Sequence, residues 1–189
     1  MILPGIVKLA FGNAKGMDEF SPTAEAFAAS LAPLIAFPLV GAVITGLAGS
    51  WRLATLEFLA RICTVLVLPL LTYEFSRLFN RQSQWIRTAT ALNWCFWLAM
   101  PAVLLAAIIG STVAQMGLPI ERVAGVVLGI AGLYLLWNRW FILKSGLQIN
   151  GWKAAIIVLA SLILIALLSI LPLFIGLQSA GVELMPPPT

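Results

Sequence analysis

The chain has 189 residues, of which 61% are hydrophobic and only 10% are charged, whereas a typical soluble domain has about 45–50% and about 25%. This composition and a mean hydropathy of +1.04 exclude a soluble globular domain. The sequence contains no histidine, which excludes a His-ligated haem, most catalytic zinc sites, and serine or cysteine nucleophiles activated by imidazole. We therefore expect an integral membrane protein that holds no cofactor or metal and is not an enzyme.

The net charge of +4 would indicate nucleic-acid binding in a soluble protein. Here the basic residues gather at the ends of apolar segments, where they set membrane topology and contact lipid headgroups. We therefore expect membrane lipids as partners and no nucleic acid. Cys63 and Cys95 both fall inside apolar segments, so we expect small buried hydrophobic residues, with a disulfide as the alternative.

Residues 1–30 are the N-terminal segment of a single membrane domain that we expect to cover residues 1–189. Apolar side chains are interspersed there with Lys8 and Lys15, which indicates a short helix or an extended arm at the membrane interface. Ser21 followed by Pro22 is typical of a helix start, with Ser21 as the N-cap and Pro22 in the first helical position.

Five apolar segments follow, and each approaches the roughly 20 residues that a membrane helix needs. The first contains Pro33 and Pro38 and the third contains Pro101; each proline favours a kink because it removes a backbone donor. The predicted spans are residues 31–49, 53–71, 89–114, 123–143 and 152–177, followed by a mobile tail over residues 178–189. The fold class is therefore all-α, a polytopic transmembrane bundle of five helices.

Positive charge predicts the orientation of this bundle. With five spans, most lysines and arginines lie on the side of the N-terminus: Lys8, Lys15, Arg77, Arg81, Arg87, Arg139, Lys144 and Lys153. The opposite side has Arg52 and Arg122, with Arg61 slightly inside the second span. Because basic residues concentrate on the cytoplasmic side, we expect a cytoplasmic N-terminus and an outward C-terminus.

Glu57 and Arg61 are a candidate intramembrane polar pair. They are four residues apart with the acid first, so they share one face of a helix and are able to pair. Ionisable groups inside a membrane commonly mark a functional site, which favours a polar lining or a contact with a partner. The alternative is a structural ion pair at the membrane boundary, with Arg61 extended toward water.

Small residues recur at helical spacing and are candidates for helix packing, because they let helix backbones approach closely in lipid. The third span carries Ala102, Ala106 and Gly110, and the fourth carries Gly125 and Gly129 in a GxxxG pattern. These stripes predict packing within the chain, with an oligomer or partner interface as the alternative. Asn93 and Asn138 are expected to form hydrogen bonds between helices.

The loop between the second and third spans holds the candidate lipid-headgroup residues Arg77, Arg81, Arg87 and Trp85. Three arginines next to an indole are suited to an anionic headgroup. The alternative is positive charge that only sets the topology.

The layout resembles the Yip1-like family of five-span membrane proteins, especially its bacterial members, over roughly residues 25–178. The segments that carry the likeness are Leu31-Ala32-Pro33-Leu34-Ile35, the exit from Tyr73 to Arg87, Trp97-Leu98-Ala99-Met100-Pro101, Gly132-Leu133-Tyr134-Leu135-Leu136, Gly146 and Lys153-Ala154. The resemblance implies a compact bundle without catalytic residues in the bacterial inner membrane. Eukaryotic members bind small GTPases through an Asp-Leu-Tyr-Gly-Pro-like segment, whereas residues 18–22 here lack the Tyr-Gly pair, so GTPase binding is not expected.

The sequence therefore predicts a non-enzymatic membrane scaffold or accessory subunit that packs against other membrane proteins, a second copy of itself, or lipids. The alternative is a small-solute transporter or channel that works as an oligomer, which would use the kinked first span and the Glu57–Arg61 pair.

Overall fold

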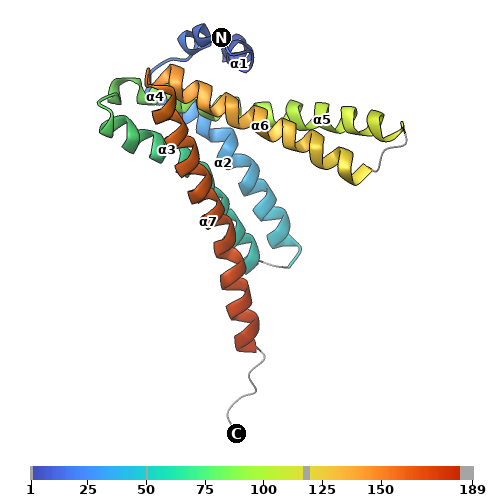
Figure 1. Ribbon diagram of the computed structural model, residues 1–189. Helices are drawn as coiled ribbons and strands as arrows, with labels where there is room; N and C mark the ends of the chain where they lie inside the picture. Colours follow the sequence, from blue (N-terminus) through green and yellow to red (C-terminus); the bar gives the residue numbers. More distant parts are fainter. Residues whose placement is uncertain (1, 50, 117–119, 184–189) are drawn as a thin grey trace. The chain divides into compact units, whose positions relative to one another are not determined.

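The computed structural model describes residues 2–49, 51–116 and 120–183, and every regular element in these ranges is a helix (Figure 1). The longer helices are α1 (Ile2–Ala10), α2 (Ala24–Leu47), α3 (Trp51–Leu78), α4 (Trp85–Cys95), α5 (Ala99–Ala114), α6 (Ile120–Gly146) and α7 (Gly151–Glu183). Three short 3-10 helices lie between them: η1 (Ala14–Glu19), η2 (Gln82–Gln84) and η3 (Phe96–Leu98).

Five helical segments in the described residues are long and apolar enough to cross a membrane. They are Ala24–Leu47, Ala54–Leu78, Gln82–Val113, Arg122–Gly146 and Gly151–Ile170. This confirms the predicted all-helical class and the predicted number of apolar spans. The helices extend beyond the predicted spans at most ends, because the polar and charged flanking residues continue the helix after the apolar window has ended.

The structure differs from the local predictions in three details. The helix start is capped by Thr23, whose Oγ1 accepts a hydrogen bond from the Ala26 amide at 3.2 Å, and not by Ser21. The third span is interrupted by η3 just before Pro101, which has no N–H to donate to the carbonyl of Trp97 and whose ring crowds that carbonyl. Residues 178–183 of the predicted mobile tail belong to α7, and residues 184–189 lie outside the described residues.

The chain divides into two compact units, of which the first comprises Met1–Ser30 and Thr72–Val158. Within it α5 and α6 pack side by side (Figure 1), with α4 and the α1–η1 segment also against α6. The α5–α6 contact uses small side chains: Ala106 is buried, and a Cβ added to Gly110 would lie 3.9 Å from Val123.

The second unit comprises Leu31–Leu71 and Leu159–Thr189, which are parts of α2, α3 and α7. The turn between α2 and α3 depends on two glycines. Gly49 has a φ of +103°, a left-handed conformation that favours glycine. A Cβ on Gly46 would collide with the indole ring of Trp51, so glycine is needed there for close approach.

A buried core of the first unit is formed by residues of α1, η1, α4, α6 and α7. Its fully or almost fully buried apolar residues are Leu9, Met17, Phe20, Ala89, Leu92, Ile142, Leu143, Leu147, Ala154 and Ile157. Leu9 and Phe20 are 0% and 2% exposed, and complete burial of such a side chain stabilises by about 1.5–3 kcal/mol. The N-terminal segment is therefore anchored through its own apolar side chains.

Candidate functional site

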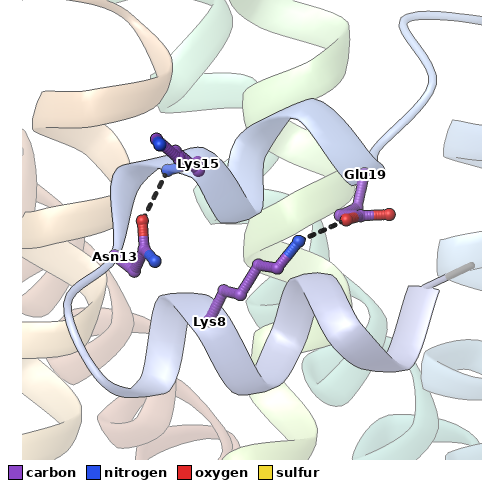
Figure 2. Close-up of polar contacts among 4 residues, drawn as sticks. All are labelled: Lys8, Asn13, Lys15 and Glu19. Carbon is purple, nitrogen blue, oxygen red and sulfur yellow. Dashed lines mark hydrogen bonds and ion pairs between the residues drawn. The ribbon is translucent and has the colours of Figure 1, made fainter.

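The α1–η1 segment, which we call the N-terminal cap (residues 2–20), folds as a helical hairpin with two polar ties (Figure 2). The side chain of Asn13 accepts a hydrogen bond from the Lys15 amide at 3.1 Å and so caps η1. Lys8 on α1 forms an ion pair with Glu19 at the end of η1, at 2.5 Å. Gly5 and Gly16 let the two helices approach so closely that a Cβ on Gly16 would lie 2.8 Å from the Gly5 carbonyl oxygen.

The Lys8–Glu19 pair gives the cap a pH dependence. Lys8 lowers the pKa of Glu19 below its ordinary value of 4.5, first through a hydrogen bond and then through its charge. A carboxylate whose pKa is lowered by folding stabilises the folded form above its unfolded pKa, and this contribution is lost as the pH falls through the folded pKa.

We expect the amides of α1 and η1 to exchange with solvent faster as the pH is lowered below about 4.5, beyond the intrinsic pH effect on exchange. Hydrogen exchange of the cap between pH 7 and pH 3 measures this. Lys8→Gln is the control, because it removes the partner and should flatten the pH dependence. An equally strong dependence in the Lys8→Gln variant would contradict the assignment.

Side chains of α6 fix the cap to the rest of the first unit. Asn138, which is 3% exposed, donates from Nδ2 to the carbonyl oxygen of Leu9 at 3.0 Å. Tyr134 donates its hydroxyl to the carbonyl oxygen of Ala10, also at 3.0 Å. The last carbonyls of a helix lack partners in their own helix, so α6 provides a side-chain cap for the C-terminus of α1.

A cavity of about 520 Å3 lies between the cap and the adjoining helix ends of the first unit. It is lined by Ala14, Lys15, Met17, Asp18 and Pro22 from the cap side, by Ser83, Gln84 and Arg87 from η2 and α4, and by Ser145, Gly146 and Gln148 from the end of α6. The lining is mainly polar or charged, with two basic side chains and one acidic one. We call this space the cap cavity.

Three charged side chains and one amide oxygen of the cap cavity have no partner among the described residues. Among the described residues, no ion-pair or side-chain hydrogen-bond partner lies within reach of the charged groups of Lys15, Asp18 or Arg87. The side-chain oxygen of Gln84 is buried and has no hydrogen-bond partner in the described part of the chain. Lys15 and Asp18 are exposed to solvent and Arg87 is partly exposed, whereas the buried Gln84 oxygen lacks the partner that buried polar groups normally have. The lining therefore offers unpaired charges and one unpaired acceptor to a polar, charged ligand.

The four candidate headgroup residues do not form one site in the structure. Arg77 pairs with Glu74 at 3.4 Å and lines a separate cavity of about 630 Å3 at the end of α3. Trp85 packs against Phe27 and Tyr73, with ring centroids 5.5 Å and 5.0 Å away. Arg81 is exposed in the loop after α3. Arg87 alone among the four lines the cap cavity.

Glu57 and Arg61 lie on α3, in the second unit, within the first two turns of the span Ala54–Leu78. Both are exposed, and the structure forms no ion pair between them in its described residues. Two charges at the end of a span remain available for water, headgroups or a partner.

The predicted packing stripes behave differently on the two helices. Ala102, Ala106 and Gly110 lie on α5, and Ala106 and Gly110 take part in the contact with α6. Gly125 and Gly129 on α6 have no atom within 4 Å of an added Cβ. The structure therefore uses the stripe of α5 within the chain and leaves the GxxxG pattern of α6 open.

Cys63 is exposed, Cys95 is buried, and both are free, so the expected burial holds only for Cys95 and no disulfide joins the two. Asn93 donates to Ser30 Oγ at 2.9 Å and so links α4 to α2.

Sequence reasoning did not find Lys15, Asp18 or Gln84 as residues of one cavity. Lys15 and Asp18 are separated from Gln84 by two whole helices, and local spacing carries no signal of such a contact. Asn13 is a residue type that commonly caps helices, and it directly precedes η1. This capping signal would have predicted a helical turn that fixes the position of Lys15. Comparison with family models, curated proteins and solved structures finds no match to this chain.

Proposed function

We propose that this protein is a non-enzymatic scaffold or accessory subunit of the bacterial inner membrane, similar to the Yip1-like proteins, with a cytoplasmic N-terminus and an outward C-terminus. It packs laterally against another membrane protein or a second copy of itself. The excess of basic residues beside the N-terminus supports this orientation.

The observation that carries the proposal is the open face of α6 in the first unit. Gly125 and Gly129 have nothing within 4 Å of an added Cβ, and Leu128 and Leu133 beside them are 50% and 67% exposed. In lipid, helices associate through close backbone approach at small residues, because lipid and leucine side chains are equally apolar. Such a face is suited to a second helix from another chain.

We expect the protein purified in mild detergent to form a complex of fixed stoichiometry, which native mass spectrometry measures. Gly129→Val should reduce the complex on the order of tenfold, because its side chain blocks the close backbone approach that small residues permit and a loss of about 1.4 kcal/mol is a factor of ten in association. Gly41→Val on α2 is the matched control, since Gly41 also faces open space within a span. A complex that survives Gly129→Val unchanged would contradict this interface.

The transporter alternative depends on Glu57 and Arg61, whose exposed and unpaired charges lie inside a span. Solute flux into liposomes that is abolished by Glu57→Gln and by Arg61→Gln would favour it over the scaffold. The scaffold proposal expects no flux that depends on either residue.

A further inference from the structure

We infer that the cap cavity binds the headgroup of a glycerophospholipid, specifically a phosphodiester whose alcohol carries hydroxyl donors, such as phosphatidylglycerol. The inference uses the proposed membrane orientation only to assign the side of the membrane on which the lipid lies. It goes beyond lateral packing by assigning a specific ligand class to named residues of the first unit.

The position of the cavity along the spans fits a headgroup. Gln84 and Arg87 lie in the first two turns of the segment Gln82–Val113, and Ser145 and Gly146 end the segment Arg122–Gly146. The fifth segment begins at Gly151, shortly after Gln148 of the lining. The cavity therefore lies at the ends of three apolar segments, where a bilayer changes from acyl chains to headgroups.

The charge of the cavity fits a phosphodiester. Lys15 and Arg87 contribute two positive charges and Asp18 one negative charge, which leaves a net charge of +1. A phosphodiester with a neutral alcohol carries one negative charge, so it would neutralise the cavity. Arg87 has the planar fork of donors that binds phosphate oxygens in pairs, and Lys15 adds a mobile ammonium. Neither has a partner among the described residues.

The hydrogen-bond acceptors in the same lining favour a headgroup whose alcohol has hydroxyl donors. Gln84 has a buried side-chain oxygen without a donor, and the exposed Asp18 carboxylate also accepts hydrogen bonds. A glycerol headgroup supplies hydroxyl donors to both groups. A choline headgroup has no N–H or O–H, so it would leave the Gln84 oxygen without a donor, and an unpaired buried acceptor is costly. The cavity should therefore prefer phosphatidylglycerol to phosphatidylcholine.

The pairing of charges within the separate cavity at the end of α3 argues against that cavity for this role. The larger cavity of about 630 Å3 contains Arg77 and Glu74, and these two are already paired at 3.4 Å. Its charge is neutralised within the protein. Both cavities, at about 630 Å3 and about 520 Å3, lie within the range of about 300–1,000 Å3 that ligand sites occupy. The unpaired charges of the cap cavity, and not its volume, distinguish the two.

The test is titration of the delipidated full chain in detergent with short-chain phosphatidylglycerol, followed by native mass spectrometry and by the shift in unfolding temperature. We expect one saturable lipid that binds more tightly than phosphatidylcholine. Arg87→Gln and Lys15→Gln should each weaken phosphatidylglycerol binding on the order of tenfold, because one charge-assisted hydrogen bond is worth about that factor. Arg87→Lys should restore part of the loss.

Arg81→Gln is the matched control, because Arg81 is an exposed arginine just before η2 that does not line the cavity. It should leave binding unchanged. Gln84→Leu should reduce the preference for phosphatidylglycerol over phosphatidylcholine. The inference is overturned if Arg81→Gln and Arg87→Gln weaken binding equally, or if neither does so while both variants keep the lipid-free unfolding temperature of the parent chain.

Soluble glycerophosphoglycerol, which is the same headgroup without acyl chains, distinguishes the two sources of this chemistry. Weaker binding than that of phosphatidylglycerol supports a lipid, whereas equal binding overturns the lipid assignment and gives the cavity to a soluble phosphodiester. Failure of the lateral complex on the Gly129 face would leave these results unchanged, so the inference and the proposed function fail separately.

Discussion

Replacing Gly146 by alanine should destabilise the first unit by about 1–3 kcal/mol, the cost of inserting a methyl group into a well-packed core. An added Cβ would lie 2.5 Å from Thr88 Oγ1 and 2.9 Å from Met17 Cε. Thr88 is completely buried, and its hydroxyl donates to the Gln84 carbonyl at 2.8 Å, so it cannot move without losing that bond. Met17 is 5% exposed, so it has little room to move.

Denaturant unfolding in micelles, with hydrogen exchange of η1 as a local readout, measures this effect. Gly41→Ala on α2 is the control, because its added methyl group meets open space and Gly41 lies outside the proposed α6 interface. Alanine is favoured over glycine inside a helix by about 0.5–1 kcal/mol, so this control should be neutral or slightly stabilising. Equal stability of the two variants would show that the close contact at Gly146 is relieved at no cost.

Replacing Asn138 by leucine should detach the N-terminal cap from α6. The substitution removes the hydrogen bond to the Leu9 carbonyl in a site that is 3% exposed. The carbonyl keeps one bond, from the Gly12 amide at 3.1 Å. We therefore expect the lower part of the usual penalty for a broken buried hydrogen bond, about 1–2 kcal/mol.

This loss should appear as faster proteolysis after Lys8 and Lys15, and as faster hydrogen exchange of α1, with little change in α5. Tyr134→Phe is the graded comparison, because Tyr134 is only half-buried and makes a single bond to Ala10. It should loosen the cap less than Asn138→Leu does. Protection of α1 that is unchanged in Asn138→Leu would mean that apolar burial of Leu9 and Phe20 alone holds the cap.

Hydropathy was sufficient to predict the number of apolar helices, because a span of about 20 apolar residues is a local property of the sequence. It was not sufficient for the helix ends. Ser21 and Thr23 flank Pro22 and are both good N-caps, and the structure uses Thr23. Pro101 predicted a kink near the middle of the third span, whereas the helix tightens one turn earlier, at Phe96–Leu98, where the proline leaves a carbonyl without its donor.

The cap cavity lay beyond sequence reasoning because it depends on contacts between residues far apart in the chain. Asn138 was expected to form a hydrogen bond between spans, and the structure gives it the backbone of α1 as its partner. Arg87 was grouped with Arg77 and Arg81 because they are close in sequence. In the fold Arg87 shares a cavity with Lys15 of the cap instead. Periodicity indicates which residues face inward, but not which distant segment covers them.

The bonds from Tyr134 and Asn138 to the C-terminus of α1 impose an order on biosynthesis. Ribosomes make α1 before α4 and α6, so the segment that closes the cavity emerges long before the residues that hold it. The α1–η1 segment therefore stays at the membrane surface, with Leu9 and Phe20 unburied, until the fourth span has left the translocon. Nascent chains arrested before residue 134 should therefore expose this segment to chaperones and proteases, and full-length chains should protect it.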